Sequence, residues 1–352
     1  MRKQTLGAAA PTLEGGCLLK KRHFTAKQVA DILGVPKSLL LEKEREGVAP
    51  AARRDRATNH RYYLTEDLPR LRSALGLEPV LQEHRTQLFL NFKGGTGKSS
   101  IASSYAFHLA ELGLDVLAID LDAQGHLTKC LGYEGPGFKY TLYNVLIEKL
   151  PIHESIVNTK LRNFKIIPAN LGLSPVELSL TAMTAREHRL DKALEQVRDE
   201  FDVIVMDAPP NIGLLNLNAI LASNDLIIPV LADFLSYEAL RILFETLASI
   251  EEDFSFVLDR ISILLNRYNK SMNICRTALK ALEKHYGDYL LKTVVRQCTK
   301  FADASSRGIP ITQYAPSSKG AVDLMKFTGE LLGLERSAYS AEQAQSLETV
   351  NA

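Results

Sequence analysis

Short apolar segments, separated by longer stretches with the periodicity of amphipathic helices, dominate the chain from residue 87 onwards. Near-continuous apolar strands that alternate with helices are typical of a parallel sheet whose two faces are both covered. We therefore predict an α/β fold with a doubly wound, mostly parallel sheet. The expected strands are residues 87–92, 115–120, 164–169, 202–207, 226–231, 261–266 and 289–295.

The length of 352 residues leaves room for a smaller domain in front of this sheet. Residues 1–19 lack periodicity and are expected to form a flexible arm, whereas residues 20–78 are basic and helical in pattern. A polar linker is expected at 79–86 and the large domain at 87–336. The tail at 337–352 lacks an apolar face, which predicts disorder.

The cysteine spacing and the hydropathy of the chain argue against several classes of protein. The four cysteines are widely spaced, with neither a C-x-x-C pair nor histidines nearby, which argues against a structural metal site or a disulfide framework. The first 19 residues contain no apolar signal segment, and no apolar run is long enough to span a membrane. We expect a cytoplasmic protein that does not bind membranes.

A glycine-rich loop, KGGTGKSS at residues 93–100, follows the first expected strand and precedes an expected helix. In this context the loop N–H groups and the positive end of the helix dipole bind phosphate oxygens. Lys98 would reach the β- and γ-phosphates of ATP, and the Ser99 hydroxyl would bind Mg²⁺. A simple tight turn would need the glycines but neither the lysine nor the hydroxyl. The expected nucleotide-binding residues of the loop are Gly94, Gly95, Thr96, Gly97, Lys98, Ser99 and Ser100.

Aspartates end two of the expected strands. Asp120, followed by Asp122, ends one, and Asp207 ends another. Ligands of α/β sheets bind at the carboxyl ends of the strands, so we expect these three carboxylates, with Ser99, to surround Mg²⁺. A single aspartate after a strand is often only a helix cap, but three beside a phosphate loop favour a metal–nucleotide site.

The loop also contains a second lysine, Lys93, which phosphate binding alone does not require. Together with DLDAQG at 120–125, it resembles the deviant Walker A ATPases and, within them, the ParA partition proteins. The resemblance covers about residues 88–334 and includes FDVIVMDAPPNIG, LIIPVLADFLSYEAL and RGIPITQYAPSSKGA. It implies slow, partner-stimulated ATP hydrolysis by a nucleotide-dependent homodimer, in which Lys93 reaches the phosphates bound to the other subunit.

The resemblance also implies roles for individual positions. Asp122 corresponds to the carboxylate that orients the attacking water, and it acts with Lys93 and Lys98 in catalysis. Asp120 lies near Mg²⁺, and Asn266 falls where adenine is contacted. The basic positions that bind DNA without sequence preference match only in part, and ordinary solvated charges are the alternative. These positions are Lys270, Arg296, Lys300 and Arg307.

The N-terminal part predicts two short helices within residues 24–47, with Thr25 as a cap, then a basic stretch and a third helix. Residues 20–72 contain 13 Lys and Arg against 7 Asp and Glu. This order, with RYYLTEDL at 61–68, resembles the winged helix-turn-helix domain of MerR-type regulators. A small helical dimerisation cap is the alternative. The resemblance implies DNA contacts from the second helix and the wing by Lys37, Ser38, Arg53, Arg54, Arg56 and Arg61.

The two resemblances together imply a DNA-partition ATPase. ATP would close the dimer, the dimer would bind DNA across the nucleoid, and a centromere-binding ParB-type partner would trigger hydrolysis and release. The N-terminal domain would bind the protein's own operator and repress it. The main alternative is a nucleotide-controlled transcription regulator. A MinD-like membrane positioner needs a basic amphipathic C-terminal helix, and a nitrogenase-type iron protein needs paired interface cysteines; the sequence shows neither.

Overall fold

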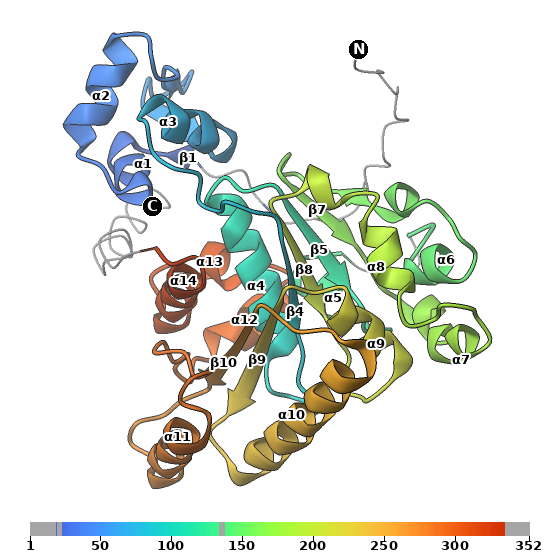
Figure 1. Cartoon of the computed structure of the whole chain (residues 1–352). Coiled ribbons are helices and arrows are strands. Elements are labelled where there is room, and N and C mark those ends of the chain that lie inside the picture. The colour runs from blue at the N-terminus through green and yellow to red at the C-terminus, as the bar shows by residue number, and fades with distance from the viewer. Residues whose placement is uncertain (1–18, 20–22, 134–137, 335–352) are drawn as a thin grey trace.

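The computed structural model describes residues 19, 23–133 and 138–334 (Figure 1). The expected arm, apart from Leu19, and the expected tail lie outside the described residues. Among the residues that are described, no helix has both the length and the apolar character that a membrane span requires.

A seven-stranded sheet with the order β10-β9-β4-β8-β5-β7-β6 forms the centre of the large domain. Neighbouring strands pair in parallel, except that β6 pairs antiparallel with β7. The predicted α/β fold with a mostly parallel sheet is confirmed. The strands are β4 (Arg85–Phe89), β5 (Val116–Asp120), β6 (Val157–Asn158), β7 (Phe164–Ile167), β8 (Val203–Asp207), β9 (Asp225–Leu231) and β10 (Arg260–Asn266).

The strand predicted at 289–295 was wrong. Leu290 and Arg296 form only isolated bridges to Ile263 and Tyr268. Between these bridges, the N–H groups of Lys292 and Thr293 donate to the carboxylate of Glu330 instead of to a neighbouring strand. A side chain from the last helix thus replaces the ladder that the apolar pattern predicts.

Helices cover both faces of the sheet, as the buried side chains of β4 illustrate. Phe89 packs in one core layer, while Leu88 packs in the layer on the opposite face. The first layer contains α4 (Lys98–Glu111), α5 (His126–Cys130), α12 (Lys300–Ser306), α13 (Ile311–Tyr314) and α14 (Lys319–Leu331). The second contains α6 (Leu142–Leu146), α7 (Val176–Thr181), α8 (Arg189–Leu194), α9 (Leu214–Leu221), α10 (Phe234–Phe254) and α11 (Asn273–Tyr286). Short 3₁₀ turns are η1 (Thr65–Asp67), η2 (Ile152–Ser155), η3 (Leu171–Leu173) and η4 (Arg198–Glu200).

The small N-terminal domain has its own antiparallel sheet, with the order β1-β3-β2, and its own core. The first helix begins at the predicted cap, where Thr25 and Gln28 form a reciprocal capping box. Two helices, a basic hairpin and a third helix follow one another. The elements are β1 (His23–Phe24), α1 (Ala26–Leu33), α2 (Lys37–Arg45), β2 (Arg53–Arg54), β3 (Arg61–Leu64) and α3 (Leu68–Ala74).

The small domain packs against the end of α4 that is remote from the phosphate loop (Figure 1). Gly113, just beyond α4, has a φ of +93°, and a Cβ there would lie 2.9 Å from Leu68 and 3.0 Å from Pro69 of α3. Only a glycine fits both this backbone conformation and this close approach. The two domains therefore meet at one end of the helix whose other end begins the nucleotide site.

Candidate functional site

The phosphate loop connects β4 to α4, and its shape depends on two glycines. Gly95 and Gly97 have φ angles of +74° and +89°, in the left-handed region that favours glycine. Between them, the buried Thr96 accepts a hydrogen bond through its C=O from Asn266 Nδ2 at 2.7 Å. A Cβ on Gly97 would collide with the same amide. Asn266, at the end of β10, thus holds the loop closed, and its contact with adenine stays a prediction.

Lys98 is the first residue of α4, where backbone N–H groups are free to bind an anion. Its side chain is only 7% exposed, and its Nζ donates to the C=O of Lys93 at 3.4 Å. Burial lowers the pKa of Lys98, whereas the charges of Asp207 and Asp122 oppose this effect. The lysine therefore lies among the predicted carboxylates. Ser100 instead turns towards α12, where its Oγ lies 3.2 Å from Ser305 Oγ.

Asp120 and Asp207 occupy paired positions at the ends of β5 and β8, and both are fully buried. Asp120 accepts hydrogen bonds from the N–H of Asp122 and from both the N–H and the hydroxyl of Thr128, at 2.7 to 3.0 Å. Burial raises the pKa of Asp120 to about 6, although these hydrogen bonds act in the opposite direction. Its carboxylate is thus already occupied by the protein.

Asp207 has a different environment. Among the described residues, no group meets either of its carboxylate oxygens in hydrogen-bonding geometry. Burial raises the pKa of Asp207 well above the usual value, and the charge of Asp120 adds to this, while the Ser99 hydroxyl and Lys98 partly offset it. A buried carboxylate without hydrogen bonds of good geometry is costly, even with Ser99 and Lys98 nearby, and a bound cation would relieve that cost. Asp207 is therefore the carboxylate best prepared for a metal ion.

Asp122 lies on the loop after β5 and is partly exposed. Its Oδ1 accepts the N–H of Gln124 at 2.9 Å, and its Oδ2 lies 3.6 Å from His126 Nδ1. The C=O of Asp122 accepts the N–H of Gly125 at 2.8 Å. These contacts fix a tight turn that presents the carboxylate near Lys98, as the effect of Asp122 on the Lys98 pKa indicates.

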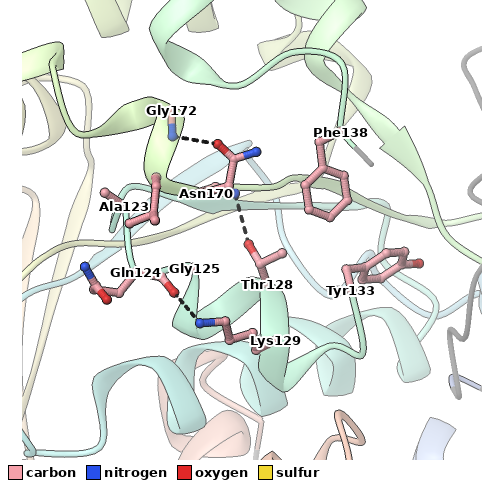
Figure 2. Close-up of a pocket in the computed structure, with 11 residues that line it drawn as sticks. Ala123, Gln124, Gly125, Thr128, Lys129, Tyr133, Phe138, Asn170 and Gly172 are labelled. Carbon is pink, nitrogen blue, oxygen red and sulfur yellow. Dashed lines mark hydrogen bonds between the residues drawn. The ribbon is translucent and has the colours of Figure 1, made fainter. Parts of the chain in front are cut away.

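A cavity of about 490 Å³ borders the same loop (Figure 2). Figure 2 shows Thr128 and Lys129 of α5 on one side and Asn170 and Gly172 opposite them. The Thr128 hydroxyl connects the two walls, because it accepts the N–H of Ala169 at 3.0 Å. The same hydroxyl donates to Asp120, which lies behind the cavity wall. The walls of this cavity are thus directly connected to the predicted metal site.

Lys93 is held by residues of its own chain. Its Nζ lies 2.7 Å from both carboxylate oxygens of Asp233 and 3.3 Å from Ser236 Oγ. Partial burial disfavours the charge on Asp233, but the hydrogen bonds from Lys93 and Ser236 outweigh this and lower its pKa. The sequence did not identify this partner, which lies 140 residues away in the segment LADFLSYEAL.

Some of the predicted DNA-binding positions of the large domain come together. The bridge between Tyr268 and Arg296 brings the loop after β10 beside the segment that leads to α12. Lys270 is exposed on this loop, next to Arg276, whose guanidinium donates to the C=O of Lys270. Arg296 forms a two-pronged ion pair with Asp323. Lys300 and Arg307 both lie against the ring of Tyr314.

The predicted positions of the N-terminal domain lie on two elements. Lys37 and Ser38 are exposed in the first turn of α2, and Arg54 and Arg56 are exposed on the hairpin. Two other hairpin arginines have acidic partners: Arg53 pairs with Glu66 and Asp67, and Arg61 pairs with Glu44.

Sequence reasoning missed three residues that contact the predicted ones, and only the first of these pairs joins distant parts of the chain. Asp233 holds Lys93, Thr128 holds Asp120, and Arg276 accompanies Lys270. His126 carried a local signal, because a histidine four residues after Asp122 on the same tight turn can reach its carboxylate. In the described part of the chain, no group of three or more His, Cys, Asp or Glu side chains could hold a metal ion without other ligands.

Comparison with known proteins shows which family the chain resembles. A family model described as an AAA domain matches residues 85–263. The chain is 48% identical over 309 residues to the cell division protein PomZ of Myxococcus xanthus (strain DK1622), which covers 88% of this chain and 92% of that protein. It is 33% identical over 239 residues to the sporulation initiation inhibitor protein Soj of Bacillus subtilis (strain 168), covering 67% and 94%.

The fold is also found among solved structures. Cobyrinic acid a,c-diamide synthase from Mycobacterium smegmatis, with bound ATP analog and magnesium, matches with a TM-score of 0.62 and 26% identity, covering 71% of this chain and 94% of that one. The residues that the family model matches include the phosphate loop and the paired aspartates Asp120 and Asp207. The chain therefore belongs to this AAA-domain family, as a P-loop ATPase of the ParA/MinD type.

Proposed function

We propose that this protein is a DNA-partition ATPase that forms a homodimer around ATP and binds DNA without sequence preference in that state. Hydrolysis, stimulated by a ParB-type centromere-binding partner, then releases the protein from the nucleoid. The observation that carries the proposal is Asp207 beside Lys98 at a phosphate loop, a fully buried carboxylate whose oxygens receive no hydrogen bond of good geometry from the described residues and whose charge is only partly offset by Ser99 and Lys98.

The loop residues fit ATP. Gly94 and Gly95 are exposed, so the backbone between them can approach a phosphate closely, and the N-terminus of α4 adds its dipole. Lys98 supplies a buried positive charge where the terminal phosphates would lie. In this proposal Gly94, Gly95, Thr96, Gly97, Lys98, Ser99 and Ser100 form the nucleotide site with Asn266.

The carboxylates fit Mg²⁺ as well. Mg²⁺ at nucleotide sites binds one or two protein groups together with phosphate oxygens and waters, so three protein ligands are not needed. Asp207 and Ser99 would hold the ion, with Asp120 and Asp122 beside it. When bound, Mg²⁺ supplies positive charge that favours phosphoryl transfer to water. Asp122, fixed by the turn up to Gly125, would orient the attacking water.

Dimerisation and DNA binding are the finer parts of the proposal. Lys93 is 21% exposed, which leaves it accessible to a second subunit once Asp233 releases it. Lys270, Arg296, Lys300 and Arg307 would contribute to a phosphate-binding surface with Arg276. Arg296 is partly neutralised by Asp323 and Lys300 by Asp303, so both should contribute less than Lys270 and Arg307.

A nucleotide-controlled transcription regulator is the second candidate, and the N-terminal domain favours it. Its order of two helices, basic hairpin and third helix places Lys37 and Ser38 on an exposed helix start, where base edges could be read. In the partition reading, the same domain would bind the protein's own operator.

One experiment distinguishes these functions. DNA binding should be measured without nucleotide, with ADP and with ATP, on random DNA and on the gene's own upstream region. ATP-dependent, salt-sensitive binding to random DNA, lost in Lys93→Ala together with the dimer, is the expected result. Binding only to the upstream region in every nucleotide state would refute the partition role and leave a regulator.

A further inference from the structure

The loop that follows Asp207 borders the predicted Mg²⁺ site. It spans residues 208–213, with the sequence APPNIG, between the end of β8 and the start of α9. Its first N–H group, that of Ala208, donates to the C=O of Phe89, the last residue of the strand that leads into the phosphate loop. Two prolines follow, and proline has no N–H group to donate. The rest of the loop therefore depends on contacts from neighbouring side chains.

One such contact comes from Asn216, in the first turn of α9. The residue is only 2% exposed, and its Nδ2 donates to the C=O of Pro209 at 3.0 Å and to the C=O of Asn211 at 2.6 Å. A buried amide that binds two carbonyl groups of one loop restricts where that loop can lie.

The other contact comes from Glu177 of α7, a helix that packs against α9 (Figure 1). Its Oε2 accepts the N–H of Leu214 at 2.8 Å, and both carboxylate oxygens lie 3.4 Å from the backbone nitrogen of Leu215. These are the first two N–H groups of α9, and they have no acceptor within the helix. A negative charge at this end also interacts favourably with the helix dipole. Glu177 therefore caps α9 from a different helix.

The approach of Glu177 to the loop is close. A Cβ on Gly213 would collide with the Glu177 carboxylate, 2.8 Å from its Cδ. The φ of Gly213 is −152°, an extended conformation open to any residue, so the space and not the backbone angle requires glycine. The last residue of the loop is thus packed directly against this carboxylate.

The N–H groups between these two contacts are available to a ligand. In the described part of the chain, no acceptor receives the N–H of Asn211, Ile212 or Gly213. Consecutive backbone N–H groups in a loop are well suited to bind phosphate oxygens. Since Glu177 binds the two N–H groups that follow, and Asn216 the carbonyl groups that precede, together they determine where these three donors lie.

We propose that Glu177 is a positioning residue for ATP hydrolysis, which fixes the start of α9 and so holds the donors of residues 211–213 at the edge of the nucleotide site. The inference rests on the proposed function, in which ATP lies at the phosphate loop and Asp207 helps to hold Mg²⁺. Glu177 itself touches neither group in this assignment. Its loss should therefore lower the turnover rate, which depends on precise placement, more than the affinity for ATP, which Lys98 and the glycine loop provide.

The test compares two carboxylates that hold backbone N–H groups in the same way. Glu330 of α14 accepts the N–H groups of Lys292 and Thr293 at 2.7 and 2.8 Å, away from the nucleotide site. Glu177→Ala and Glu330→Ala should lose similar stability in urea, which makes Glu330→Ala the matched control. Basal ATP turnover should fall about tenfold or more in Glu177→Ala but stay at the wild-type level in Glu330→Ala. The Kd of a slowly hydrolysed ATP analogue should change less than about twofold in both.

Two further measurements separate positioning from a general loss of structure. Glu177→Gln retains an oxygen that can accept the N–H of Leu214, so its turnover should return to within about threefold of wild type. Hydrogen exchange needs no turnover. With the analogue and Mg²⁺, the amides of residues 211–215 should exchange more slowly than without nucleotide in the wild type and in Glu330→Ala, but not in Glu177→Ala.

Wild-type turnover in Glu177→Ala, or an equal loss of turnover in Glu330→Ala, would overturn the proposal. So would a Glu177→Ala chain that no longer dimerises with the analogue in sedimentation, since Glu177 would then act at the subunit interface. A wild type without ATP turnover contradicts the proposed function instead. Hydrogen exchange still decides in that case, because equal protection of residues 211–215 in Glu177→Ala and the wild type refutes the positioning role.

Discussion

Replacement of Asp207 by asparagine tests whether this carboxylate is held ready for a cation at the expense of stability. The residue is fully buried, and its oxygens lack hydrogen-bond partners in the described part of the chain. Leaving a buried charged group unsatisfied costs about 1–3 kcal/mol or more. Asparagine removes the charge at nearly the same volume, but its amide also needs partners. We therefore expect Asp207→Asn to raise the free energy of unfolding of the nucleotide-free protein by about 1–2 kcal/mol at neutral pH.

The raised pKa of Asp207 predicts how the stability gain of Asp207→Asn depends on pH. Burial raises the pKa of Asp207 well above that of an unfolded aspartate, and Asp120 adds to the shift. A carboxyl group with a raised folded-state pKa lowers stability above that pKa, and this loss disappears below the unfolded pKa near about 4. The gain from Asp207→Asn should accordingly be complete above the folded-state pKa and vanish at about pH 4.

Urea unfolding followed by circular dichroism measures the effect, since the chain has no tryptophan for fluorescence. Asp253→Asn, an exposed change on α10, should alter stability by less than about 0.5 kcal/mol. With ATP and Mg²⁺ the order should reverse, because the wild type binds the ligand and is stabilised by it. An Asp207→Asn protein that is less stable without nucleotide, or equally stabilised at about pH 4, would refute the reasoning.

Three further predictions concern the phosphate loop, Asp122 and the binding of random DNA. Gly97→Ala should weaken ATP binding in calorimetry at least about tenfold, because a left-handed alanine costs about 1–2 kcal/mol and its methyl group displaces Asn266; the exposed Asp253→Asn should bind normally. Asp122→Ala should retain ATP binding and dimerisation but lose phosphate release, and undiminished turnover would exclude Asp122 from the chemistry. Binding to random DNA through about four phosphate contacts should fall about a hundredfold between about 50 and 200 mM salt, and an unchanged affinity would rule out a basic surface as its cause.

Sequence alone predicted the parts of the fold that depend on local pattern. The apolar runs at 202–207 and 261–266 became β8 and β10 with nearly the predicted bounds, because buried parallel strands need apolar side chains on both faces. The run at 289–295 has the same character, but its N–H groups bind Glu330, a partner that no local pattern reveals. The two-residue strand β6 is too short to leave a signal.

The candidate site also contains features that the local sequence predicts and others that it does not. Lys98, Asp120 and Asp207 were predictable because loop spacing and strand ends determine their positions. Ion pairs between segments that are distant in the chain could not be predicted. They reduce the positive charge that the paired arginines can offer to a ligand. Arg61 is bound to Glu44, and Arg296 to Asp323, so a count of basic residues overstates the charge available to DNA. These pairs depend on packing that only the folded chain defines.

The end of β10 connects the phosphate loop with the loop that carries the predicted DNA-binding residue Lys270. Asn266 binds the phosphate loop through Thr96, and its Oδ1 accepts the N–H of Arg267 at 2.8 Å. Arg267 has a φ of +52°, a left-handed conformation that costs a non-glycine residue about 1–2 kcal/mol and persists only if its neighbours enforce it. The next residue, Tyr268, bridges to Arg296 beside Lys270. The phosphate loop and the predicted DNA-binding positions Lys270 and Arg296 are therefore joined through a few consecutive residues at the end of β10, one of them in a left-handed conformation.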